Sequence, residues 1–303
     1  MRLLAVLLFV FSFNTLAKDK QMAITIDDLP ANTLSRDHAT WSKINEQILG
    51  ALTEFDVQSV GFVNENKLYL NEKKIDRRVD LLRDWLNANQ ELGNHSFAHL
   101  DLHRVESKEF INDIAIGDKV LQQLWQKNPP KIKYFRHPFL HTGRSAEVRT
   151  EVEQFLSSKA YVVAPVTIDN QEYIFARAYE RASEGERKKV EQDYVSYMLE
   201  MVDYYQQQSQ AILGYELPQI LLLHANQLNG KTLSNLLQGI EQKGFVFVTL
   251  EEALKDSAYE RADSYYGPGG ITWLHRWALT DKMPSSIFGK EPTVPEYIMQ
   301  LYR

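Results

Sequence analysis

The stretch "AITIDDLP", residues 23–30, decides the fold and points to a site. It begins as an apolar, β-branched run, which is typical of a buried strand, and it ends in two adjacent carboxylates, Asp27 and Asp28. The ordinary role of such an Asp pair is a turn or a helix cap. Because two neighbouring negative charges repel each other, a buried pair needs a positive partner. A partner for the second carboxylate is therefore expected elsewhere in the chain.

Outward from this stretch, seven strand-like units alternate with helical patterns, which predicts an α/β architecture. A βα-barrel and an open doubly wound sheet both fit. In either fold, reactive residues gather at the carboxyl ends of the strands, and Asp27, Asp28, Arg136, Asp169 and His224 all occur at such ends. The predicted strands include 22–26, 57–63, 131–136, 160–168, 219–224 and 245–250.

Three further segments have expected structures of their own. Apolar residues between 110 and 125 recur at helical spacing and predict one helix. Residues 174–212 predict a long inserted helix whose tyrosine and methionine stripe is core packing. The tail 256–303 reads as an ordered extension packed on the barrel, with 273–277 alternating as a strand would. The expected catalytic domain is 18–255.

The composition excludes several classes of function. The chain has 303 residues with 44% hydrophobic and 24% charged residues, a formal net charge of −6 and no Cys. It therefore has no disulfides, thiol nucleophile or cysteine-bound zinc, and its scattered acidity argues against nucleic acid as a partner. Residues 1–17 form a short apolar run after a single Arg, which predicts a removable secretory signal. We expect a periplasmic or secreted protein with no stable membrane insertion after signal removal.

The sequence "NHSFAH" (94–99) places His95 and His99 four residues apart. On a helical turn this spacing faces both imidazoles one way, as a divalent metal requires. A chance pair of this kind is common in a chain with eight His. With Asp28 as the third ligand, however, the pair completes a two-His, one-carboxylate site. The metal then supplies the counter-charge for Asp28, and Asp27 remains free to act as a base.

Five motifs in order resemble the polysaccharide deacetylases of the NodB-homology type, carbohydrate esterase family 4. They are "TIDD", "HSFAH", "FRHPF", "DNQEY" and "LLLH", and the resemblance covers about residues 20–255. It implies a distorted (β/α) barrel that removes acetyl groups from sugars with a divalent metal. It further implies that Asp27 is the general base, and that Asp28, His95 and His99 bind the metal.

The resemblance also implies roles for the later motifs. Arg136 would orient Asp27, keep it ionised and lower its pKa. The loop of Pro138 and Phe139 would bind substrate, with the Phe139 N–H helping to stabilise an oxyanion. Leu222 would line the acetyl pocket, and His224 would be the general acid.

The fourth motif departs from the family pattern D-x-x-D-W, because it reads "DNQEY". Either Glu172 or Asp169 would tune His224, and Tyr173 replaces the tryptophan of the pattern. The first motif also departs, with "DDLP" in place of "DDG". Both changes lie where the substrate pocket is shaped.

The resemblance implies removal of N-acetyl groups from an amino-sugar polysaccharide or oligosaccharide of the chitin or peptidoglycan kind. Two alternatives stay open: an O-acetyl esterase acting on a polysaccharide such as xylan, and a catalytically silent carbohydrate-binding protein. Zinc is the expected metal, and a site of this composition also accepts Co²⁺ or Ni²⁺.

Overall fold

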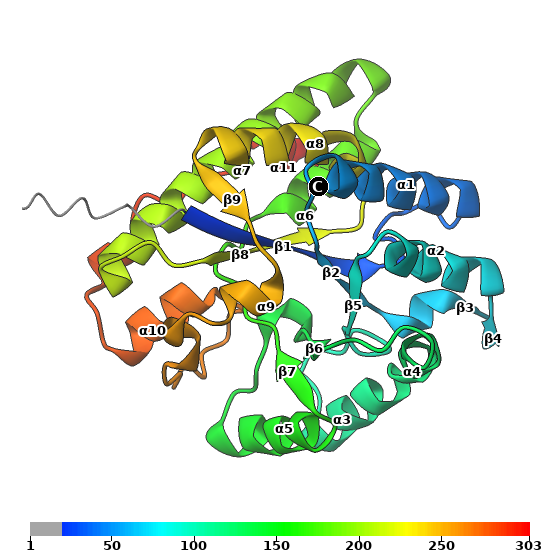
Figure 1. Ribbon diagram of the computed structural model, residues 1–303. Helices are drawn as coiled ribbons and strands as arrows, with labels where there is room; N and C mark the ends of the chain where they lie inside the picture. Colours follow the sequence, from blue (N-terminus) through cyan, green and yellow to red (C-terminus); the bar gives the residue numbers. More distant parts are fainter. Residues whose placement is uncertain (1–19) are drawn as a thin grey trace, which may run out of the picture.

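The computed structural model describes residues 20–303, and the predicted signal segment 1–17 lies outside this range. The centre of the molecule is a seven-stranded parallel sheet (Figure 1). A separate antiparallel pair, β3 and β4, forms a small hairpin at the periphery. The strands are β1 (Lys20–Leu29), β2 (Val60–Val63), β3 (Tyr69–Leu70), β4 (Lys73–Lys74), β5 (Glu91–Asn94), β6 (Lys133–Phe135), β7 (Tyr161–Val163), β8 (Gln219–His224) and β9 (Phe245–Phe247).

The sheet curls until its two ends meet, which makes a distorted barrel. The strand order is β7-β6-β5-β2-β1-β8, and β9 pairs with the first residues of β1. The chain that follows β7 then bonds to β8: Ile168 donates its N–H to the Ile220 carbonyl at 3.0 Å, and Leu222 donates to the Ile168 carbonyl at 3.1 Å. The predicted strand 160–168 is therefore a short strand followed by this closing segment.

Helices cover the outside of the curled sheet (Figure 1). Short 3-10 turns, η1 (Glu65–Leu68), η2 (Pro138–Leu140), η3 (Ser257–Glu260) and η4 (Ser285–Phe288), connect some of the elements. The α-helices are α1 (His38–Glu54), α2 (Asp76–Asn87), α3 (Ser107–Ile116), α4 (Lys119–Trp125), α5 (Ala146–Ser158), α6 (Glu172–Arg181), α7 (Glu184–Leu213), α8 (Gln227–Gln242), α9 (Leu250–Ala253), α10 (Trp273–Thr280) and α11 (Glu296–Tyr302).

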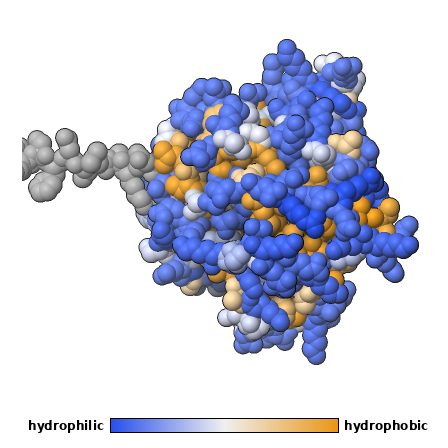
Figure 2. Space-filling model, turned by 45° about the vertical axis from the view of Figure 1, so that its right-hand side comes forward, coloured by the Kyte–Doolittle hydropathy of each residue, from blue (hydrophilic) through white to orange (hydrophobic). Residues whose placement is uncertain are grey.

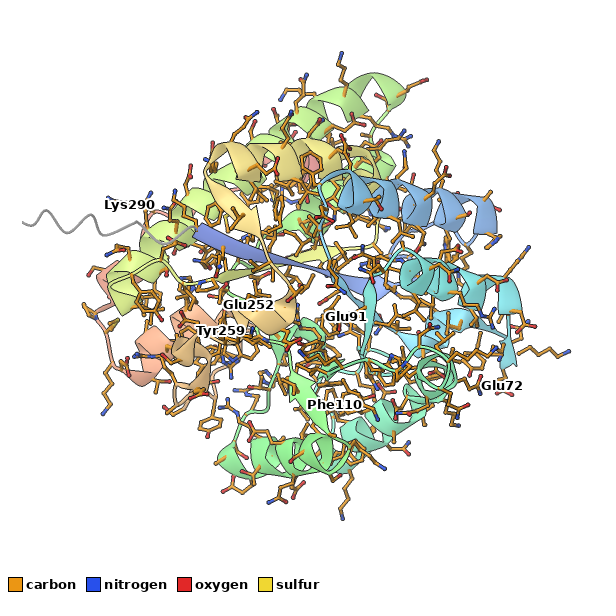
Figure 3. All side chains as sticks on the ribbon, in the orientation of Figure 1. Glu72, Glu91, Phe110, Glu252, Tyr259 and Lys290 are labelled. Carbon is orange, nitrogen blue, oxygen red and sulfur yellow. The ribbon has the colours of Figure 1, made fainter. Side chains whose placement is uncertain are left out.

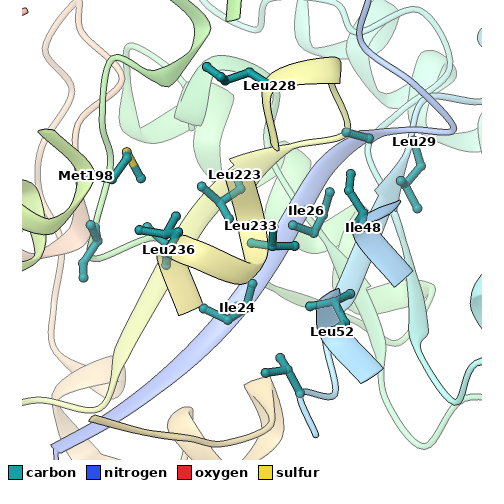
Figure 4. Close-up of a cluster of buried hydrophobic side chains, with 14 of the residues drawn as sticks. Ile24, Ile26, Leu29, Ile48, Leu52, Met198, Leu223, Leu228, Leu233 and Leu236 are labelled. Carbon is teal, nitrogen blue, oxygen red and sulfur yellow. The ribbon is translucent and has the colours of Figure 1, made fainter. Parts of the chain in front are cut away.

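The main core lies between β1, β8 and the helices α1, α7 and α8 (Figure 4). Ile24 and Ile26 of β1 lie beside Leu233 and Leu236 of α8, and all four are at most 1% exposed. Burying each such side chain contributes roughly 1.5–3 kcal/mol. This packing fixes the strand whose carboxyl end carries the Asp pair.

Two predicted helices are broken. The helix expected over 110–125 is two helices, α3 and α4, because it ends at Gly117, where the backbone of Ser96 and Phe97 approaches too closely for a side chain. The helix expected over 174–212 is also two, α6 and α7. The break falls before Ser183, which forms a capping box with Glu186 at the start of α7. The tyrosine and methionine stripe of α7 is buried, as predicted.

The predicted strand at 273–277 is wrong, because these residues form α10. Thr272 caps this helix by accepting the N–H of His275, which commits the segment to helical geometry. The tail then continues along the side of the molecule, where α10 packs against α7, and α11 packs against α6 (Figure 1).

The side-chain distribution is that of a folded domain with a polar outside. The face in Figure 2 is mostly hydrophilic, with apolar residues gathered between the surface elements. In Figure 3, Glu72 and Lys290 lie at the outer edge, and both are exposed. Phe110 instead lies inside, with its ring 6.3 Å from that of Phe135. No helix within residues 20–303 is both long and apolar enough to cross a membrane.

Candidate active site

The two adjacent carboxylates lie where β1 ends, and both are buried. In the parallel register, Asp27 lies opposite His224 of β8, and the Ala225 N–H donates to the Asp27 carbonyl at 3.0 Å. Asp28 has a φ of 69°, in the left-handed region. The strand geometry therefore changes between the two residues, and their side chains meet different partners.

Asp27 faces a buried arginine. Arg136, which is fully buried, donates from Nη1 to both carboxylate oxygens of Asp27 at 3.4 Å and from Nη2 to Thr25 Oγ1 at 3.0 Å. Burial nevertheless raises the pKa of Asp27 to about 6, because the cost of desolvation exceeds the attraction of Arg136. Arg136 does lower this pKa, as expected, but it does not outweigh burial, so the net shift is upward. A pKa close to neutrality suits a general base.

Asp28 faces the two histidines. One ligand atom from each of Asp28, His95 and His99 lies within 4.8 Å of the other two, and His99 Nε2 is 3.8 Å from Asp28 Oδ1. The predicted helical turn for the two histidines is wrong, because they lie in the loop after β5. Left-handed φ angles at Ser96 (64°) and His99 (56°) bend this loop so that both rings still meet Asp28.

The charge states of this triad fit a divalent cation. The carbonyl of Arg136 lies 2.8 Å from His95 Nδ1, so this nitrogen carries the proton and Nε2 is free to act as a ligand. Burial lowers the pKa of both histidines and keeps them neutral. Burial opposes ionisation of Asp28, but the positive charge of Lys67 is the largest of the effects that outweigh it and hold the pKa of Asp28 well below the usual range. Two neutral imidazoles and a carboxylate are a composition typical of catalytic metal sites.

His224 is held by Glu172. Its Nδ1 lies 2.5 Å from Glu172 Oε2, and the side chains of Asn226 and Asn229 donate to the other carboxylate oxygen. Burial disfavours the imidazolium, but the charge of Glu172 and its hydrogen bond outweigh this and raise the pKa of His224 to about 9.

Asp169 does not share this bond within the described chain. Its Oδ1 accepts the N–H of Asn170 at 2.8 Å, and burial raises its pKa to about 6. Of the two candidates that the sequence left open, Glu172 is the one in contact with His224.

The third motif forms a tight turn at the mouth of the site. Phe139 and Leu140 have φ angles of 57° and 55°, both left-handed. The N–H groups of Leu140 and His141 bond to the carbonyls of His137 and Pro138, while the structure records no protein acceptor for the Phe139 N–H within residues 20–303. The Phe139 ring packs edge-on against His99, with 4.5 Å between centroids.

The side chains predicted to carry the chemistry, with the exception of Arg136 and Glu172, open onto one cavity of about 670 Å³. It brings together the carboxylate pair, the histidine pair and His224, and one side is walled by Leu222 and Tyr173. Of the residues predicted to contact substrate, Phe139, Leu222 and Tyr173 line this cavity, whereas Pro138 is not among its lining residues. The remaining lining residues are Asn32, His137, Phe139, Leu140, Asp169, Asn170, Gln171, Tyr205, Gly270, Ile271, Thr272, His275 and Glu291.

Comparison with protein families agrees with this geometry. Residues 15–155 match the family model of the polysaccharide deacetylases. Over these residues the chain is similar to the polysaccharide deacetylase family. A search of curated protein sequences finds no match.

Several solved structures have the same fold as this chain. A peptidoglycan deacetylase from Bacillus subtilis, in a mutant form, is 19% identical with a TM-score of 0.51, and the match covers 80% of this chain and 95% of that one. A chitin deacetylase from Colletotrichum lindemuthianum has 19% identity and a TM-score of 0.51, over 79% and 89% of the two chains. A carbohydrate esterase family 4 pseudoenzyme from Bacillus anthracis has 17% identity and a TM-score of 0.51, and the match covers 78% of this chain and 66% of that one. The fold is thus the distorted NodB-type barrel.

Sequence reasoning missed two parts of the candidate site. Lys67 lies 3.4 Å from Asp28 Oδ1, and the Asn32 side chain donates to Asp28 Oδ2 at 2.7 Å. Neither Lys67 nor Asn32 belongs to a motif or a residue spacing that would have identified it as part of the site. The tail also reaches the cavity, through Gly270 and Glu291 among others. The signal for this was the glycine-rich run at 267–270, which allows a close backbone approach.

A second His-containing cluster lies beside this cavity. Asp101 Oδ1 is 2.6 Å from His141 Nδ1, and His103 stacks on His141 with 3.8 Å between centroids and 7° between planes. In parallel rings the nitrogen lone pairs lie in separate planes and do not converge on one point. This arrangement is therefore a packed pair that supports the neighbouring loops.

Proposed function

We propose that this protein is a metal-dependent hydrolase that removes N-acetyl groups from an amino-sugar polysaccharide or oligosaccharide. One observation carries the proposal: a carboxylate of pKa about 6, a His₂Asp triad and a Glu-supported histidine of pKa about 9 line a single cavity. These are the base, the metal ligands and the acid that amide hydrolysis needs. A silent binding protein has no need for two oppositely tuned groups on one cavity.

Asp28, His95 and His99 would hold the cation, zinc by preference, with Co²⁺ or Ni²⁺ also compatible. When bound, the cation supplies Lewis acidity toward the acetyl carbonyl and makes water more acidic. Asp27 then takes the proton from the attacking water. Arg136 orients the Asp27 carboxylate through its two 3.4 Å contacts.

The other residues handle the charge and the leaving group. The Phe139 N–H points to the role of oxyanion donor, since it has no protein acceptor within the described chain. His224 holds a proton at Nε2 and gives it to the departing amine, while Glu172 bonds Nδ1. Each positioned acid or base contributes roughly 10²–10⁴-fold to the rate.

The substrate and location belong to the same proposal. We propose chitin-, peptidoglycan- or related glycans as substrates, and the apolar run at 1–17 supports a periplasmic or secreted protein. An O-acetyl ester passes through the same kind of oxyanion, so the assay below includes one.

The experiment measures acetate released by purified protein, after chelation and after addition of Zn²⁺, Co²⁺ or Ni²⁺. The substrates are chitin oligosaccharides, peptidoglycan and acetylated xylan, and Asp28→Asn is the matched control. We expect metal-dependent release from at least one N-acetylated substrate. Release from xylan alone would establish an esterase instead, and no release from any substrate would overturn the proposal.

A further inference from the structure

We propose that residues 263–276, here called the C-terminal strap, position the Phe139 turn and so complete the active site. The inference rests on the proposed function, since it concerns the oxyanion donor of that reaction. Gly270, Ile271 and Thr272 of the strap line the catalytic cavity although they lie beyond the barrel strands. Gly270 is thereby a positioning residue.

The first argument is steric. The strap backbone lies directly against the turn: a Cβ built on Gly270 would come 1.7 Å from the Phe139 carbonyl oxygen and 3.2 Å from His141 Cδ2. Real side chains do not approach backbone oxygens this closely, so only glycine fits unless the turn or the strap moves.

The second argument concerns the turn itself. Phe139 and Leu140 are consecutive non-glycine residues in the left-handed region, a conformation that surrounding contacts must maintain. Trp273 of the strap supplies one such contact. Its side chain packs against the buried cluster of Leu140, Val166 and Leu222, and its backbone N–H donates to the Val166 carbonyl at 2.8 Å.

The third argument is a polar anchor just beyond the turn. Thr142 Oγ1 accepts from Arg276 Nη2 at 2.5 Å and from Arg149 Nη2 at 3.0 Å. Asp263 accepts from Arg276 Nε at 2.7 Å and offsets the buried charge. Because Arg276 is 1% exposed, these bonds are shielded from water. The strap therefore holds both Leu140 and Thr142, the residues one and three positions after Phe139.

The test compares two neighbouring glycines. Gly270→Ala should reduce kcat 10-fold or more with little change in KM, because the oxyanion donor acts mainly in the transition state. Gly269→Ala is the matched control: its Cβ would meet only ordinary contacts at 3.6 Å, and Gly269 does not line the cavity. Zn²⁺ stoichiometry and Tm are measured for both. Equal kcat in the two variants would overturn the proposal.

A second variant and an activity-independent readout keep the outcome decisive. Thr142→Val keeps the shape but removes the acceptor of both arginines, and we expect a severalfold loss in kcat with unchanged metal binding. A crystal structure of Gly270→Ala should show the Phe139 peptide displaced. An unmoved Phe139 turn with the strap swung away would refute positioning by the strap, whether or not the wild type releases acetate. Absence of wild-type activity would instead count against the proposed function.

Discussion

Glu172 and His224 form the pair on which the proposed acid step depends. Fully buried Glu172 raises the pKa of His224 to about 9, so the imidazolium persists across neutral pH. Activity that needs this proton should fall as pH rises through about 9. Glu172→Gln removes the charge, so the alkaline limb of the pH profile of kcat should move to lower pH. Asp169→Asn is the control and should shift the limb much less, because Asp169 does not contact His224 within residues 20–303.

The same pair affects stability. The folded pKa of His224 lies above its ordinary value of 6.5, so its contribution is complete below pH 6.5 and is lost as pH rises through about 9. The free energy of unfolding, measured by denaturant titration, should therefore decline over this interval. In Glu172→Gln the decline should be smaller. An unchanged slope in that variant would contradict the assigned pairing.

Replacing Asp27 or Asp28 by Asn should have clearly different effects on metal binding and on turnover. Asp27→Asn leaves the triad intact and should keep bound metal while losing ~10²-fold or more in turnover. Asp28→Asn removes a ligand and should lose activity through weaker binding, with partial recovery in excess metal. Metal content and kcat measured side by side decide this. Retained metal in Asp28→Asn with loss in Asp27→Asn would reverse the two roles.

Among the elements, the loop after β5 depends on a glycine in another segment. A Cβ on Gly117 would lie 2.5 Å from the Ser96 carbonyl carbon, so the break between α3 and α4 leaves room for the loop that carries His95 and His99. Gly117→Ala should weaken divalent-metal affinity by shifting this loop, as measured by calorimetric titration. Gly50→Ala, in open space on α1, is the control and should raise stability by roughly 0.5–1 kcal/mol with metal affinity unchanged.

Element by element, sequence periodicity predicted the strands better than the helix boundaries. The run before Asp27 is almost continuously apolar, which is typical of a strand that is buried on both faces. The break at Gly117 could not be predicted, because the distant Ser96 backbone dictates it, whereas the break before Ser183 has a local signal in the capping box with Glu186. Likewise, His95 and His99 have helical spacing but meet through two left-handed residues, which spacing does not encode.

For the whole molecule, the family motifs located the chemical groups, and tertiary contacts supplied the rest. Asp27, Asp28, His95, His99 and His224 were all named from motifs, and the structure brings them to one cavity. Lys67 and the C-terminal strap were not identified from motifs, because their contacts join segments that lie far apart in sequence. Burial also reversed the expected net pKa shift of Asp27, because the sequence around a residue does not show how deeply the fold buries it.

The central position of β1 has a consequence for how the chain acquires its structure. This strand is synthesised first among the described elements, yet it pairs with β8 and β9, which are synthesised late. High contact order of this kind slows folding, since a long loop must close before the pairing is gained. A nascent chain lacking residues 219–247 cannot complete the middle of its sheet. The β8 and β9 edge of β1 therefore stays unpaired until these late residues have been synthesised.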